Sequence, residues 1–204
     1  MVVKLKDPGA YRALWAFDRE AYLAHLKRLT PADRLSRFQY AATDEQLERH
    51  VDEFLKQGGH LIGWFIDGEL RAAAEVALLG DGHAAEGAFE VEAPWRGRGV
   101  GAELVGRALL WARNRGARQL LIHTTRRNTA MLSAAKQRGA TFAFDLADAD
   151  GVIEAPRASW TSHLREIRFE ESGTLHWLWD VGRRNLQRWL GLKRRGDGND
   201  PAPS

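Results

Sequence analysis

The feature that most constrains this chain is the stretch Arg96-Gly97-Arg98-Gly99-Val100-Gly101. It follows an apolar segment, residues 87–91, and opens a strongly helical one, residues 100–115. Glycine lets the backbone turn tightly and approach a ligand closely, because no Cβ intervenes. The first N–H groups of a helix have no intrahelical partner, and two arginines there oppose the helix dipole unless an anion is bound. The stretch therefore predicts a turn that holds a diphosphate, although a tight turn with solvated arginines would leave the same pattern.

Length and composition limit the class of protein. The chain has 204 residues, room for one sizeable core and an extension, and its 44% hydrophobic and 28% charged content is that of a soluble globular protein. We expect a cytoplasmic location, because the sequence has no apolar run long enough to span a membrane and no signal-peptide pattern. The absence of cysteine excludes disulfides and thiolate metal sites, and the seven histidines show no metal-binding spacing. The net charge of +3 does not by itself indicate nucleic acid.

The first sixty residues are expected to hold a short strand and then helices. Residues 2–6 alternate briefly and predict the strand, after which Pro8 can open a helix. The apolar face of that helix would be formed by Tyr11, Leu14, Trp15, Tyr22, Leu26 and Leu29. Thr30 followed by Pro31 predicts the start of a second helix, and a capping box at residues 43–46 predicts a third over residues 44–56.

The rest of the chain alternates between strands and helices. Two strands at residues 60–66 and 69–79 are joined by the hairpin turn Asp67-Gly68. The later strands are predicted at residues 83–91, 118–124, 141–146 and 152–160, and the later helices at residues 100–115 and 128–138. Residues 148–151 are expected to form a turn, and Pro156 would place the last strand at a sheet edge.

The run from Glu86 to Gly139 resembles the core of the GNAT superfamily of acyl-CoA N-acyltransferases. Arg96, Gly99 and Gly101 fit the superfamily's pyrophosphate loop, Gln/Arg-x-x-Gly-x-Gly/Ala. Residues 85–89 are similar to the strand that carries the general-base glutamate, and Asn128 with the residues behind it is similar to the helix beside the pantetheine arm. Residues 25–38 are similar to bacterial GNAT domains related to protein lysine acetyltransferases. The resemblance implies an α/β fold, with a mixed central sheet flanked by helices.

The resemblance also implies that the protein binds acetyl-CoA as a co-substrate and that the site holds no metal. Its cofactor-binding residues would be Val91, Arg96, Gly97, Arg98, Gly99, Val100, Gly101, Ala102 and Asn128. Many family members place a tyrosine seven residues after the helix-starting asparagine, as general acid for the leaving thiolate. Here that position is Ala135, so water or another group would have to supply the proton.

Acyl transfer to an amine needs a carboxylate, because a substrate ammonium is mostly protonated at neutral pH. Glu86 is the first candidate for this general base, and Glu75 and Glu90 are its rivals. Glu86 and Glu90 share a face of a strand and could line one cleft, although each could equally be a solvated carboxylate at a strand edge. A backbone N–H near Val91 would stabilise the oxyanion if the strand bulges there as the family's does. Asn128 could bond the pantetheine, cap its helix, or both.

The last forty residues lie outside the resemblance. Residues 174–193 predict an amphipathic helix with leucine and tryptophan on one face and basic residues on the rest. This helix could dock on its own domain, form a homodimer or lie on an anionic membrane surface, and we expect packing rather than lipid binding. We therefore predict a GNAT domain at residues 1–165, a helical extension at residues 166–195 and a disordered tail at residues 196–204.

The sequence thus predicts an N-acetyltransferase that moves an acetyl group from acetyl-CoA to a primary amine, with a protein lysine as one candidate acceptor. A small-molecule amine acetyltransferase and a catalytically weak acyl-CoA sensor are the alternatives, because one fold serves many functions.

Overall fold

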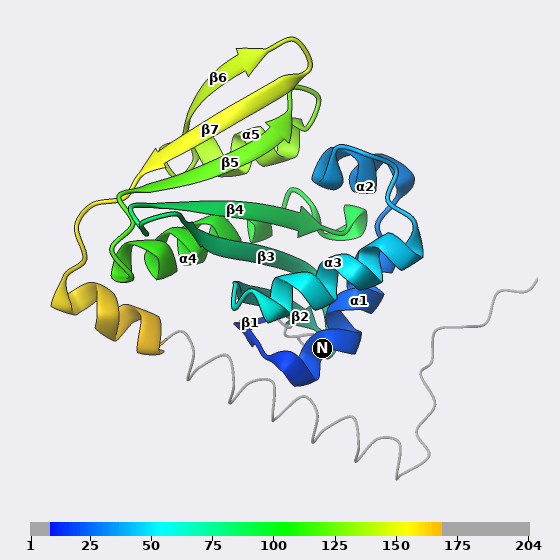
Figure 1. The fold of residues 1–204 in the computed structure, drawn as a ribbon, viewed down its shortest axis with the longest axis horizontal. Helices are drawn as coiled ribbons and strands as arrows, with labels where there is room; N and C mark the ends of the chain where they lie inside the picture. The colour runs from blue at the N-terminus through cyan, green and yellow to red at the C-terminus, as the bar shows by residue number, and fades with distance from the viewer. Residues whose placement is uncertain (1–8, 169–204) are drawn as a thin grey trace, which may run out of the picture.

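The computed structural model describes residues 9–168, which form a seven-stranded mixed sheet with helices on both faces (Figure 1). The strand order is β1-β2-β3-β4-β5-β7-β6, in which β4 and β5 run parallel and all other neighbours antiparallel. The strands are β1 (Ala10–Leu14), β2 (His60–Ile66), β3 (Glu69–Leu79), β4 (Ala84–Val91), β5 (Gln119–Thr125), β6 (Thr141–Asp145) and β7 (Asp148–Glu154). The labelled helices are α1 (Arg19–Lys27), α2 (Pro31–Phe38), α3 (Asp44–Lys56), α4 (Val100–Asn114) and α5 (Thr129–Lys136), with short 3-10 turns η1 (Ala16–Asp18) and η2 (Ala93–Trp95). Residues 160–168 are also helical (Figure 1).

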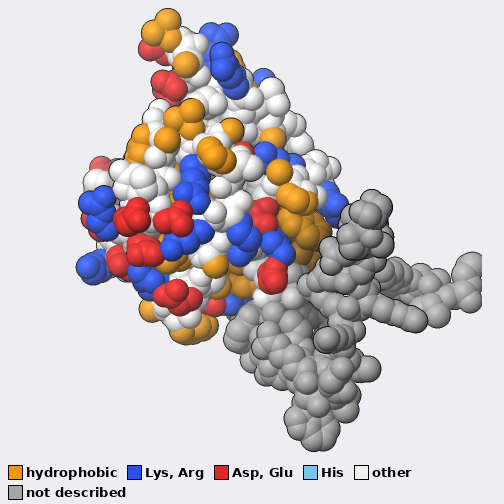
Figure 2. All heavy atoms as spheres, turned by 90° about the vertical axis from the view of Figure 1, so that its right-hand side faces the viewer, with side chains coloured by type: hydrophobic (Ala, Val, Ile, Leu, Met, Phe, Trp, Pro, Cys, Tyr) orange, Lys and Arg blue, Asp and Glu red, His pale blue; other side chains and the backbone are white. Residues whose placement is uncertain are grey.

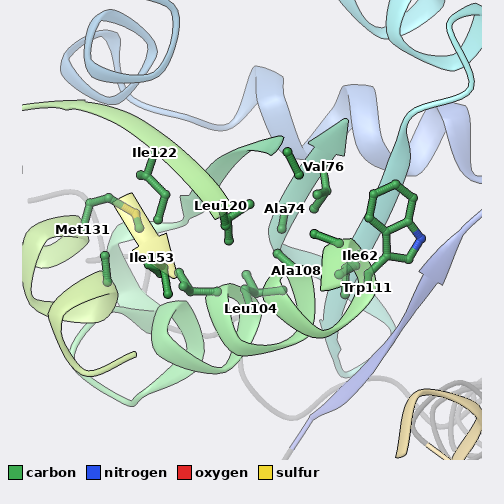
Figure 3. Close-up of a cluster of buried hydrophobic side chains, with 14 of the residues drawn as sticks. Ile62, Ala74, Val76, Leu104, Ala108, Trp111, Leu120, Ile122, Met131 and Ile153 are labelled. Atoms are coloured by element: carbon green, nitrogen blue, oxygen red, sulfur yellow. The ribbon is translucent and has the colours of Figure 1, made fainter. Parts of the chain in front are cut away.

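Two apolar cores lie on the two faces of the sheet. On one face, Leu104 and Ala108 of α4 pack against Leu120 and Ile122 of β5 and against Ile153 of β7 (Figure 3). On the other face, α1 and α3 bury leucine, tyrosine and valine side chains against β2 and β3. Both cores follow from the alternation of side chains along the strands, because successive residues of β3 enter opposite layers. The sheet is therefore fixed from both sides in its first half.

The local signals for the helices and the first hairpin are confirmed. Thr30 accepts a hydrogen bond from the backbone of Asp33, and Thr43 forms a capping box with Gln46. At the hairpin, Asp67 and Gly68 have φ angles of 51° and 68°. This left-handed pair matches the right-handed twist of β2 and β3.

The first predicted helix is wrong in its opening residues. Residues 10–14 form β1, antiparallel to β2, and the helix α1 begins only at Arg19. Apolar residues at positions 11 and 14 are compatible with either a helix or a strand. The strand forms because the edge of β2 supplies hydrogen-bond partners for it. Arg12, which a helix would have exposed, forms a buried ion pair with Asp18, with Nη2 at 2.6 Å from Oδ1.

The prediction for the last strand is also wrong. The strand β7 begins at Asp148, inside the expected turn, and ends at Glu154, before Pro156. It lies between β5 and β6 and is not an edge strand. The turn comes earlier, where Leu146 has a φ of 38°. Pro156 therefore lies outside the hydrogen-bonded ladder of β7, and it does not restrict β7 to an edge of the sheet.

Three predicted segments lie outside the described residues: the strand at residues 2–6, the helix at residues 174–193 and the disordered tail at residues 196–204. Within residues 9–168, no helix is long and apolar enough to cross a membrane. The same residues contain no group of three or more histidine, aspartate or glutamate side chains arranged to hold a metal ion.

We expect Leu104→Ala to lower the free energy of unfolding by about 2–5 kcal/mol, because Leu104 is fully buried between α4 and the sheet. Leu35→Ala on α2, where the leucine is 52% exposed, is the matched control and should change stability by less than about 1 kcal/mol. Urea denaturation followed by circular dichroism measures both. Equal losses in the two variants would contradict this account of the core.

Candidate functional site

The strands β4 and β5 part shortly after they meet. Residues 84–86 of β4 pair with residues 119–121 of β5, and the two strands then run on without pairing to each other. Each keeps a complete ladder on its other side, β4 with β3 and β5 with β7. We call the unpaired stretch, residues 87–91 and 122–125, the β4–β5 opening. Its backbone groups are available to a ligand that lies between the strands.

The backbone N–H of Val91, the last residue of β4, points into this opening. Glu92 N donates to Arg71 O at 3.0 Å, which makes their pair a hydrogen-bonded one. Bonded and non-bonded pairs alternate in an antiparallel ladder, so the N–H of Val91 points away from β3 and towards the opening. The register of β3 with β4 shows no shift, so the expected bulge near Val91 is absent. Strand alternation alone turns this N–H into the opening.

The glycine-rich turn lies at the end of β4, between η2 and α4. Gly97 and Gly99 have φ angles of 71° and 84°, and a Cβ on either would meet nothing within 4 Å. These two glycines are therefore needed for their left-handed backbone. Gly101 differs, because a Cβ there would lie 3.4 Å from the Cβ of Ala134. No side chain caps the N-terminus of α4, so its first N–H groups face outward as donors.

The two arginines of the turn are held differently. Arg96 donates from Nε to Val91 O at 2.9 Å, and its Nη2 lies 2.6 Å from Oδ1 of Asp33 on α2. Arg98 lies over the ring of Trp95, 4.8 Å from its centre. Both arginines are exposed. The turn thus carries positive charge beside a helix N-terminus, with one of its two cations paired to α2.

Asn128 begins α5 on the β5 side of the opening. Its Oδ1 accepts a hydrogen bond from Met131 N at 3.1 Å, which confirms the helix-cap interpretation. Its Nδ2 donates to Ser36 Oγ on α2 at 3.1 Å. Seven residues on, Ala135 is fully buried in the core. This position therefore offers no polar group to a leaving thiolate.

The three candidate glutamates have different surroundings. Glu86, Glu75 and Glu90 share one face of the sheet, because Ala88 pairs with Glu75 and lies between the other two along β4. Glu86 is exposed, and among the described residues its carboxylate has no hydrogen-bond or ion-pair partner. Glu75 and Glu90 are each only 5% exposed. The shared face is confirmed, but only Glu86 opens to solvent.

The comparisons with known proteins agree with this geometry. The profile of the Acetyltransferase (GNAT) family matches residues 19–140. The chain belongs to the GNAT acetyltransferase family. A comparison with curated proteins gave no match.

Solved GNAT structures share the fold of this domain. The GNAT domain of S. lividans PAT superposes with a TM-score of 0.64 at 21% identity, covering 72% of this chain and 90% of its own. The protein yncA from Salmonella typhimurium, solved with its cofactor acetyl-CoA, gives a TM-score of 0.56 at 15% identity and coverages of 74% and 96%. A phosphinothricin acetyltransferase from Sinorhizobium meliloti, solved in complex with acetyl-CoA, gives 0.56 at 11% identity and coverages of 71% and 86%.

A largely buried polar cluster lies beside the opening of this GNAT domain and is formed by Tyr22, Arg37, His50, Glu75 and Glu90, of which His50 is the most exposed at 27%. Arg37 of α2 donates to both carboxylates, with Nε at 3.1 Å from Glu90 Oε2. His50 Nε2 lies 2.6 Å from Glu75 Oε1. The Tyr22 hydroxyl lies 2.6 Å from Glu75 and 3.0 Å from Glu90, yet it has one proton for two acceptors. A proton on Glu90 completes this arrangement.

The charges of the cluster separate the two carboxyl groups. Burial opposes ionisation of Glu75, but Arg37 and the hydrogen bond from His50 outweigh it and lower its pKa to about 2. Burial and the neighbouring Glu75 charge raise the pKa of Glu90 to about 7, against the effect of Arg37. One arginine thus neutralises one carboxylate, and the second carboxyl group keeps its proton near neutrality.

Sequence reasoning missed the residues that reach the site from α1, α2 and α3. Asp33, Ser36 and Arg37 contact the turn, Asn128 and the buried glutamates, and Tyr22 and His50 complete the cluster. The available signal was the position of Glu75 and Glu90 inside apolar strands, because a buried carboxylate needs partners.

We compare the free energy of unfolding of Glu90→Gln with that of wild type at pH 5 and at pH 8. We expect the difference to shift in favour of the variant by about 1–3 kcal/mol as the pH rises. The folded pKa of Glu90 is raised, so its stabilising contribution is present below pH 4.5 and is lost as pH rises through about 7. Glutamine imitates the protonated form and escapes this loss. Urea denaturation at both pH values measures the difference, with the exposed Glu154→Gln as control. A relative stability that stays constant between pH 5 and pH 8 would mean that Glu90 is already ionised in the fold at pH 5.

Proposed function

We propose that this GNAT domain transfers an acetyl group from acetyl-CoA to a primary amine, with a protein lysine as the first candidate acceptor. The observation that carries the proposal is the β4–β5 opening, with an uncapped helix N-terminus at one end and the free carboxylate of Glu86 on the same strand. The acetyl-CoA-bound relatives with this fold support the choice of donor.

The diphosphate of acetyl-CoA would bind the N–H groups of residues 98–102, where the α4 dipole and the two arginines favour negative charge. Arg98 lies beside these groups and no carboxylate pairs with it among the described residues, while Arg96 would add a second cation. Asn128 lies on the far wall, where the pantetheine amides would pass. The Val91 N–H points into the opening, where it would stabilise the oxyanion.

Glu86 is the best general base of the three candidates. It lies at the last residue of β4 that pairs with β5, its carboxylate is exposed, and no neighbour among the described residues holds it. In the proposed step it accepts the proton of the attacking amine while the C–N bond forms and the C–S bond breaks. The thiolate takes its proton from water, since Ala135 carries no acid. The depressed pKa of Glu75 makes it a weak base, and Glu90 is closed off by Tyr22 and Arg37.

The surroundings of Glu86 favour a cationic acceptor. The cross-strand register places His123, Asp148, Asp150 and Glu154 on the same sheet face as Glu86, and all of them are exposed. Among the described strand residues of β4, β5, β7 and β6 on this face, none is lysine or arginine. A negative surface attracts an ammonium group and repels an anionic acceptor. This supports a lysine or polyamine over an acidic small molecule.

We expect Gly99→Val to abolish measurable acetyl-CoA binding while the far-UV circular dichroism spectrum stays unchanged. A β-branched side chain at a φ of 84° strains the turn and covers the N–H groups that would hold the diphosphate. The matched control is Gly116→Val, because Gly116 has a φ of 99° at the opposite end of α4. Calorimetry measures the affinity. Unchanged affinity in Gly99→Val would rule out this binding site.

We expect Glu86→Gln to lower kcat by about 10²–10⁴ and to leave acetyl-CoA affinity near that of wild type. The lost rate should return in part at high pH, where more of the amine is unprotonated. Glu154→Gln removes another exposed carboxylate from the same face and should keep the wild-type kcat. Thiol release from acetyl-CoA measures the rate. Full activity in Glu86→Gln together with loss in Glu75→Gln would assign the base to Glu75.

An acceptor screen separates this proposal from its alternatives. Turnover with lysine peptides supports a protein acetyltransferase, and turnover with free polyamines or amino acids alone supports a small-molecule enzyme. Slow acetyl-CoA hydrolysis that no acceptor accelerates supports an acyl-CoA sensor. This alternative stays open because position 135 carries alanine in place of a tyrosine acid.

A further inference from the structure

The helix α2 holds both walls of the β4–β5 opening. Three of its side chains, Asp33, Ser36 and Arg37, follow the i, i+3, i+4 spacing that places them on one helix face. Asp33 pairs with Arg96 of the glycine-rich turn at 2.6 Å, and Ser36 accepts the hydrogen bond from Asn128 at 3.1 Å. The helix lies next to the ends of β4 and β5 and contacts both strands (Figure 1). Two of the polar side chains expected to bind the cofactor, Arg96 and Asn128, are therefore bound to α2, whereas Arg98 lies over Trp95.

Polar contacts fix α2 more than apolar packing does. None of its residues is fully buried, and Leu35 is 52% exposed. Phe38, at the C-terminal end of the helix, packs against the core formed with α1 and α3, so only the N-terminal end of α2 can move with little loss of buried apolar surface. The face of the molecule at this end carries acidic and basic side chains side by side, as such contacts require (Figure 2). The anchor at Arg37 is the strongest of the three, because this arginine meets two buried carboxylates. The anchors at Asp33 and Ser36 are single contacts near the surface.

We propose that Asp33 and Ser36 form a strap that competes with the cofactor for Arg96 and Asn128, so that acetyl-CoA binding transfers both side chains from α2 to the cofactor. This inference rests on the proposed function, because it needs the diphosphate at the glycine-rich turn. Asp33 thereby becomes a residue that sets cofactor affinity, and binding of the cofactor releases the N-terminal end of α2. The helix pivots about Arg37, whose partners lie inside the sheet.

The charge of Asp33 determines whether its removal strengthens or weakens cofactor binding. A carboxylate beside Arg96 neutralises the guanidinium that the diphosphate would use, and it repels the diphosphate itself. The Asp33 side chain is 19% exposed, so solvent screens this repulsion only in part. Removing its charge should therefore tighten cofactor binding. A structural role for Asp33 predicts the opposite, since loss of an anchor would loosen the site.

The variant Asp33→Asn tests this sign. Asparagine keeps an oxygen that can accept from the Thr30 hydroxyl, which donates to Asp33 Oδ2 at 2.8 Å, so α2 retains its first turn. We expect the Kd for CoA at low salt to fall by about two- to fivefold, and the gain to shrink in high salt. The control is Asp44→Asn, which also removes a carboxylate paired with an arginine of α2, Arg34 at 2.8 Å. Within residues 9–168, no hydrogen bond or ion pair joins this pair to the glycine-rich turn.

Calorimetry with CoA on the full chain gives a separate answer for each claim. No binding by wild type refutes the proposed function, before the strap is tested. Wild-type binding with an equal or weaker affinity in Asp33→Asn refutes the strap, and so does an equal gain in Asp44→Asn. Ser36→Ala supplies an independent variant with the same expected sign, because it frees Asn128 without changing any charge.

Hydrogen exchange measures the movement itself. We expect the amides of α2 to exchange faster when CoA is bound to wild type, and Asp33→Asn to show much of this increase without CoA. The amides of α4 should instead become better protected by the ligand. Slower exchange throughout α2 on CoA binding would overturn the strap, because it would show that the cofactor tightens this helix.

Discussion

The parting of β4 from β5 is the constraint on which the rest of the site depends. A strand pair that separates leaves backbone N–H and C=O groups without partners, and such groups are costly unless water or a ligand meets them. Here the cost is limited, because each strand keeps an unbroken ladder on its other edge. Arg96 returns from the turn to bind Val91 O, which satisfies one carbonyl at the end of β4. The remaining donors stay available in a position fixed by the sheet.

The residues around the opening are also held from outside the sheet, by α2. This contact requires charged groups, Arg37 and its glutamate partners, to be largely buried. Arg37 pairs with two buried glutamates that would otherwise keep only their contacts with Tyr22 and His50. Leaving one of those carboxylates unpaired would be expensive, so the arginine and the glutamates depend on one another. Glu92 repeats the pattern after β4: burial opposes its ionisation, but His25, Arg28 and Arg71 outweigh this effect and lower its pKa to about 2. Polar contacts thus position α2 and the residues around the end of β4.

Local signals in the sequence predicted those elements whose structure is decided locally. The caps at Thr30 and Thr43, the Asp67-Gly68 turn and the glycine-rich turn all appear where the sequence places them. The strand β1 could not be predicted in this way, because its pairing with β2 depends on a segment fifty residues away. The site divides similarly. Glycine spacing indicated the turn, but no local pattern in the sequence indicated that Asp33 and Ser36 would meet Arg96 and Asn128.

The contrast between Glu86 and Glu90 shows why a shifted pKa alone does not identify a general base. A pKa of about 7 is close to the ideal value for a group that exchanges protons at neutral pH, and Glu90 has it. That value arises from burial beside Glu75, and the buried carboxyl group is already engaged by Tyr22 and Arg37. Structural ion-pair networks perturb pKa values by the same physics as active sites do. A base must also reach the proton that it removes, so exposure on the open sheet face favours Glu86 over the carboxyl group with the better pKa.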